Sequence, residues 1–81
     1  MKIEILGTGC KSCEDLFQAA VTAVEEGGYD NDIEVVKVSD ITYFSKMGVF
    51  MTPGLVIDGE VISSGKVLNA QQVKAKIMER L

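Results

Sequence analysis

The sequence has no histidine and only two cysteines, and these absences restrict its metal chemistry. A closed structural zinc site needs four ligands, which are usually cysteine and histidine side chains. One copy of this chain cannot supply four such ligands. Only a site shared between two copies would complete the set.

The chain also lacks a long apolar run and an excess of basic charge. No segment approaches the roughly 20 apolar residues of a membrane span, and Met1-Lys2 leads directly into a short strand-like segment rather than a signal-peptide core. Eight basic against twelve acidic residues give a net charge of -4, without the positive field that binds phosphate backbones. We therefore expect no nucleic-acid partner, no membrane partner and a cytoplasmic location.

Low-complexity tracts, internal repeats and linkers are absent as well. The 81 residues, 47% of them hydrophobic, have the length and composition of one small globular domain. We expect residues 1–81 to form a single domain that acts as a monomer.

Hydrophobic periodicity and turn residues predict seven elements. Strands are expected at residues 2–6, 33–38, 55–57 and 60–62, and helices at residues 11–26, from Ser39 or Asp40 to Gly48, and after Asn69. Asp58-Gly59 suits a two-residue hairpin turn, and Gln72 completes a capping box with Asn69. The apolar faces of the two later helices are expected to use Ile41, Phe44 and Met47, and Ala70, Val73, Ile77 and Leu81.

These elements follow the order β-α-β-α-β-β-α. A helical crossover joins parallel strands, whereas a tight hairpin joins antiparallel ones. The sequence therefore predicts an α/β fold with a four-stranded mixed sheet flanked by three helices.

Both cysteines lie in Gly7-Thr8-Gly9-Cys10-Lys11-Ser12-Cys13, where the first strand meets the first helix. In a reducing compartment such a pair is more often catalytic or metal-binding than a permanent crosslink, and so short a loop would gain only roughly 2 kcal/mol from a disulfide. A helix start favours an anion. We therefore expect Cys10 to be the exposed attacking thiolate, with a pKa below about 8.5, and Cys13 to be the inward-facing resolving thiol.

Charged and polar neighbours surround this pair. Lys11 is expected to stabilise the thiolate, whereas Glu14 and Asp15 oppose it through like-charge repulsion. All three also suit the solvated first turn of a helix without any dedicated role. Lys11 and Ser12, which separate the cysteines, are the candidate modulating residues.

A second informative segment is Met51-Thr52-Pro53-Gly54, because proline at the start of a strand removes a ladder donor. On residues alone it predicts an ordinary trans turn, since about 5% of X-Pro bonds in folded proteins are cis. Together, Gly9-Cys10-Lys11-Ser12-Cys13, Thr52-Pro53, the hairpin and Gly65 resemble the thioredoxin superfamily. The similarity is to its compact branch of small thioredoxin-like redox-active disulfide proteins.

The resemblance implies a protein thiol-disulfide oxidoreductase that cycles a Cys10-Cys13 disulfide with client proteins and a reductase, without an organic cofactor or a metal. It also implies a cis Pro53 beside the disulfide, with Thr52 and Met51 in the substrate-binding segment, where backbone groups pair with an extended partner. Val49, Phe50 and Met51 are expected either to form an apolar docking surface or to belong to the core. Lys-Ser replaces the Gly-Pro of typical thioredoxins, and no tryptophan precedes Cys10.

The alternative is a metal-binding module, because heavy-metal-associated domains carry a similar loop between the first strand and helix. Two soft thiolates suit Cu(I). Such domains run β-α-β-β-α-β and end on a strand, whereas a helix closes this chain. The predicted order of elements therefore favours the redox interpretation.

Overall fold

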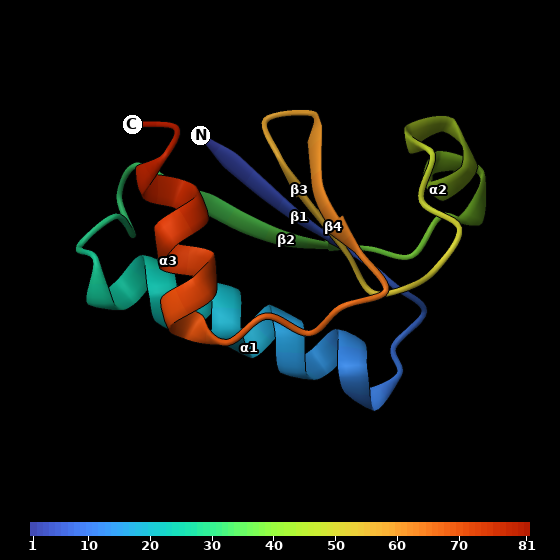
Figure 1. Ribbon diagram of the computed structural model, residues 1–81, viewed down its shortest axis with the longest axis horizontal. Coiled ribbons are helices and arrows are strands. Elements are labelled where there is room, and N and C mark those ends of the chain that lie inside the picture. The colour runs from blue at the N-terminus through green and yellow to red at the C-terminus, as the bar shows by residue number, and fades with distance from the viewer.

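The computed structural model describes residues 1–81 and contains four strands and three helices around one sheet (Figure 1). The strands are β1 (Lys2–Leu6), β2 (Glu34–Val38), β3 (Gly54–Ile57) and β4 (Glu60–Ser64). The helices are α1 (Lys11–Glu26), α2 (Ile41–Met47) and α3 (Ala70–Met78). The predicted order of elements and the α/β fold are confirmed. None of the helices has the length and apolar character needed to cross a bilayer.

The sheet is mixed, with the strand order β2-β1-β3-β4. β1 runs parallel to β2 and antiparallel to β3, and β3 and β4 form the antiparallel hairpin. At the end of β1, Leu6 lies opposite Gly54, the first residue of β3. The loop that leaves β1 and the segment that enters β3 therefore meet at the same end of the sheet.

One face of the sheet packs against α1 and α3 (Figure 1). Alternation along the strands turns the side chains of Ile3 and Ile5 toward these helices. They join a core of eleven buried residues, which also contains Leu16, Ala20, Ala23, Val24, Ile33, Leu55, Ile57, Val73 and Ile77. This core fixes α1, and with it the cysteine loop, against the centre of the sheet.

The opposite face packs against α2 (Figure 1). Leu6 and Val56 contact Phe44 and Val49 in a second cluster of four buried residues. Val49 is therefore a core residue and not part of an exposed docking surface. The hydroxyl of Tyr43 also holds α2 to the sheet, because it donates a hydrogen bond of 2.9 Å to the Glu4 carboxylate.

Local signals define the element ends as predicted. The Asp40 side chain caps α2, and Asn69 and Gln72 form the capping box of α3 with bonds of 2.8 and 2.9 Å. Asp58 and Gly59 both have positive φ, 49° and 82°, as a two-residue hairpin turn with the right twist requires.

Three expectations about single apolar residues were wrong. Ile33 precedes β2, because its N–H donates to the Tyr29 carbonyl in the preceding turn and is unavailable to the ladder. Ile41, in the first turn of α2, is 68% exposed. Leu81 lies beyond the end of α3 and is 71% exposed, so it is not part of the apolar face of that helix.

Candidate active site

The two cysteines occupy the first turn of α1 in different environments. Cys10 is the N-cap residue, with extended backbone, and its carbonyl accepts the Glu14 N–H at 3.0 Å. Its side chain is exposed. Cys13 lies on the inner side of the helix and is only 5% exposed. Because a helix begins between them, one sulfur faces solvent and the other faces the sheet.

The two sulfur atoms are free thiols 2.7 Å apart. A disulfide bond is about 2.05 Å long, so the two sulfur atoms are close enough to be candidates for a disulfide. The structure contains no group of three or more His, Cys, Asp or Glu side chains that could hold a metal ion.

Hydrogen bonding makes the two thiols unequal. The pKa of Cys10 is lowered, first because the Cys13 thiol donates a hydrogen bond to its sulfur, and then because backbone N–H groups at the start of α1 point toward it. The pKa of Cys13 is raised, mainly by burial and then by its hydrogen bond to Cys10. Cys10 is therefore the first of the pair to ionise, and Cys13 holds its proton longer.

Gly7 makes room for the buried sulfur. A Cβ atom at this position would overlap the Cys13 Sγ and lie 2.8 Å from the Cys13 Cβ. The Gly7 N–H also donates to the Val38 carbonyl at 2.9 Å, which extends the pairing of β1 with β2. The sequence placed Gly7 in a turn, but its need to be glycine comes from the approach of Cys13, which spacing alone does not reveal.

The Thr52-Pro53 segment enters β3 at the same end of the sheet. The Thr52–Pro53 peptide bond is cis, Pro53 is buried, and Thr52 is exposed. The Pro53 carbonyl accepts the Gly65 N–H at 2.9 Å. Since Gly54 pairs with Leu6, Pro53 comes opposite the start of the loop that carries the cysteines.

Side chains next to Pro53 are apolar and open to solvent. Phe50 is 82% exposed and Met51 is 68% exposed. The two alternatives for residues 49–51 therefore divide between them: Val49 is a core residue, whereas Phe50 and Met51 face outward.

Glu14, which the sequence analysis expects to oppose the Cys10 thiolate, has a lysine partner in the structure. Lys11 and Ser12 are exposed. Glu14 forms an ion pair with Lys37 of β2, and the Lys37 ammonium also lies 4.6 Å from the centre of the Phe17 ring. Lys37 thus offsets the negative charge of Glu14. The sequence did not indicate this pair, because the partners are 23 residues apart and meet only through the packing of α1 on the sheet.

We expect the reduced protein to titrate in two thiol steps, with Cys10 below the usual value of about 8.5 and Cys13 above it. Thiolate absorbance against pH, with alkylation and mass spectrometry to assign each step, measures both. A lowered pKa keeps the Cys10 thiolate populated at lower pH. Alkylation at Cys10 should therefore slow only when the pH falls through the lowered pKa of Cys10. In Cys13→Ala the S–H donor is lost, so the pKa of Cys10 should rise. A Cys10 pKa above that of free cysteine would contradict this assignment.

The variant Gly7→Ala should be less stable than the wild type by about 1–3 kcal/mol, the usual cost of overpacking. Urea unfolding of the reduced protein measures the loss. The matched background is Cys13→Ala, which removes the overlapping sulfur, so Gly7→Ala should cost less there. Equal costs in both backgrounds would show that the contact with the sulfur is not responsible.

Comparisons with known proteins agree with this geometry. A family model described as a thioredoxin domain matches residues 1–78. The chain is 35% identical to a thioredoxin of Methanocaldococcus jannaschii over 79 residues, covering 98% of this chain and 88% of the relative. It is 38% identical to a thioredoxin of Methanothermobacter thermautotrophicus over 74 residues, covering 91% of this chain and 94% of that relative. With the cysteine pair on a helix start and the mixed sheet behind it, these matches show that the chain belongs to the thioredoxin family.

Proposed function

We propose that this protein is a thiol-disulfide oxidoreductase that cycles Cys10 and Cys13 between dithiol and disulfide in exchange with partner proteins. The observation that carries the proposal is the unequal pair: an exposed thiol of lowered pKa lies 2.7 Å from a buried thiol of raised pKa. Exchange requires a thiolate that can reach a disulfide. Cys10 meets both conditions, and Cys13 meets neither until its neighbour has reacted.

In the reductive direction, the Cys10 thiolate attacks one sulfur of a client disulfide. The client S–S bond breaks, a Cys10–client S–S bond forms, and the released client thiolate takes up a proton. Cys13 then loses its proton and attacks the Cys10 sulfur, which forms the Cys10–Cys13 disulfide and releases the second client thiol. Two electrons pass from the dithiol to the client, and a reductase dithiol restores the pair by the same steps.

We place the client beside the Thr52-Pro53 segment, where the exposed backbone at Thr52 would pair with an extended client strand. Phe50 and Met51 add exposed apolar surface there. Lys11 and Ser12 lie between the cysteines in the sequence and are exposed, so Lys11 adds a positive charge and Ser12 a hydroxyl to the surface that the client meets. In this proposal the protein works as a cytoplasmic monomer, and the only redox group it needs is its own cysteine pair.

The central experiment uses Cys13→Ser. The wild type should reduce a soluble protein disulfide such as insulin, whereas Cys13→Ser should stop after the first step and accumulate a mixed disulfide through Cys10. Mass spectrometry of the trapped adduct under non-reducing conditions gives the attachment site. The matched control is Cys10→Ser, which should trap nothing, because the remaining thiol is buried and has a raised pKa.

The wild-type protein also distinguishes the redox function from the metal-binding alternative. If Cys10 and Cys13 do not form a disulfide in a dithiol redox buffer, and the reduced protein binds one equivalent of Cu(I) tightly, the soft-metal function replaces the redox function. Disulfide formation together with trapped adducts supports exchange.

Phe50→Ala tests the docking segment. We expect the free energy of unfolding to stay within about 0.5 kcal/mol of the wild type, because the side chain is largely exposed, while the rate of exchange with a protein disulfide falls about fivefold. Urea unfolding and an insulin reduction assay measure the two effects. Ile41→Ala removes another exposed apolar side chain, from the first turn of α2, and should change neither. Loss of stability without loss of rate would show that Phe50 is structural.

A further inference from the structure

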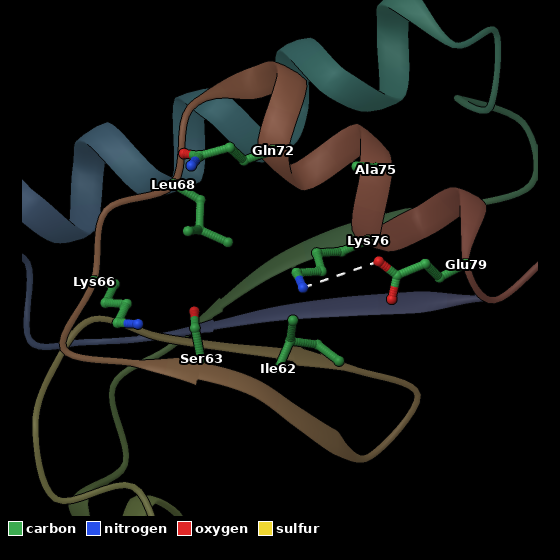
Figure 2. A pocket seen from close by; sticks show the side chains of 8 residues that line it. All are labelled: Ile62, Ser63, Lys66, Leu68, Gln72, Ala75, Lys76 and Glu79. Carbon is green, nitrogen blue, oxygen red and sulfur yellow. Dashed lines mark ion pairs between the residues drawn. The ribbon is translucent and has the colours of Figure 1, made fainter.

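A cavity of about 390 Å³ lies between β4 and α3, outside the candidate active site (Figure 2). Its walls come from β4, from α3 and from the connection between them, and they include neither cysteine and no residue of the Phe50–Pro53 segment. Its volume falls within the roughly 300–1,000 Å³ of small-molecule sites. The exchange chemistry proposed above gives this cavity no role.

A β-bulge in β4 directs a hydroxyl group into the cavity. Leu55 lies opposite Ser63 and Val56 lies opposite Val61, so Ile62 is an extra residue in β4. Bulges re-aim side chains, and here Ile62 and its neighbour Ser63 both face α3 (Figure 2). The Ser63 Oγ is buried and has no hydrogen-bond partner. Because buried polar groups in proteins are nearly always paired, this hydroxyl needs a partner that the protein itself does not supply.

The groups around this hydroxyl are mainly donors. The ammonium groups of Lys66 and Lys76 lie on either side of Ser63 (Figure 2). The Gln72 amide lies farther off, above Leu68 in the view (Figure 2), where its carbonyl oxygen accepts the Asn69 N–H of the capping box. The only carboxylate of the cavity, on Glu79, lies 3.9 Å from the Lys76 Nζ and 3.8 Å from Arg80. Arg80 has a nearer partner in Glu60, at 2.9 Å. The two lysines and one glutamate of the lining therefore leave an excess of one positive charge, in a chain with a net charge of -4.

The rest of the wall is apolar and comes from Ile62, Leu68 and Ala75. Ile62 and Leu68 are half-buried and pack against the main core, which makes them a fixed surface. Small-molecule sites combine such apolar walls with a few converging polar groups that orient the ligand. Here the polar groups select a negative charge, and the apolar walls select a short hydrocarbon.

We propose that this cavity binds a small organic anion, in which a carboxylate or phosphate group lies between Lys66, Lys76 and the Ser63 hydroxyl and a short apolar chain contacts Ile62 and Leu68. No bond forms or breaks, so the site is one of binding alone.

The first test measures binding to the full-length reduced protein by two-dimensional NMR of ¹⁵N-labelled amides. Hexanoate and hexyl phosphate should give saturable shifts at Ser63, Lys66 and Lys76, and the tighter of the two identifies the preferred anionic group. Hexanol lacks the charge and inorganic phosphate lacks the chain. Each should bind at least about tenfold more weakly, because hexanol loses hydrogen bonds to a charged group and inorganic phosphate loses buried hydrocarbon. The absence of saturable shifts with both hexyl anions would overturn the proposal.

The second test uses variants of the lining residues. Ser63→Ala should weaken binding of the preferred anion about tenfold without lowering the urea midpoint, because the lost hydroxyl has no partner in the protein. Lys76→Gln should weaken it as well, whereas Lys74→Gln, on the same helix but outside the cavity, should not. Unchanged affinity in Ser63→Ala, or equal losses in Lys76→Gln and Lys74→Gln, would show that the anion binds elsewhere on the surface. Both readouts are independent of Cys10 and Cys13.

Discussion

The packing of the Cys13 sulfur against Gly7 is the contact on which the candidate site depends. It places one thiol inside the protein at a helix start, where the other thiol, three residues earlier, must remain outside. Burial then raises the pKa of Cys13, and the proton that Cys13 keeps is shared with the Cys10 sulfur and lowers the pKa of Cys10. The space at Gly7 and the N–H groups at the start of α1 thus together make two identical side chains chemically different.

The mixed sheet brings the remaining parts of this site together. Because β3 runs antiparallel to β1, the segment that enters β3 meets the loop that leaves β1, and Pro53 comes opposite Gly7. The parallel neighbour β2 supplies Lys37, which pairs with Glu14 and offsets a carboxylate one turn from Cys10. Strand direction therefore decides which distant residues surround the sulfurs.

On the face of the sheet that α1 and α3 cover, an opening remains beside the edge strand β4. α1 and α3 pack together over the central strands, but β4 is the edge strand, and its bulge carries Ile62 and Ser63 into the space beside α3. The protein therefore has two chemically different regions, a pair of exchangeable thiols at one end of the sheet and a donor-rich cavity under α3.

The sequence by itself determined the features that depend on neighbours within a few residues. The capping box at Asn69, the Asp58-Gly59 turn and the helix that begins after Cys10 all follow from short-range hydrogen bonds and backbone preferences, so their spacing predicted them. Only the tertiary structure decided which apolar residue of the 49–51 segment is buried, why position 7 is glycine and which cation pairs with Glu14. Each of these depends on atoms brought together from separate elements, and no local pattern in the chain records such contacts.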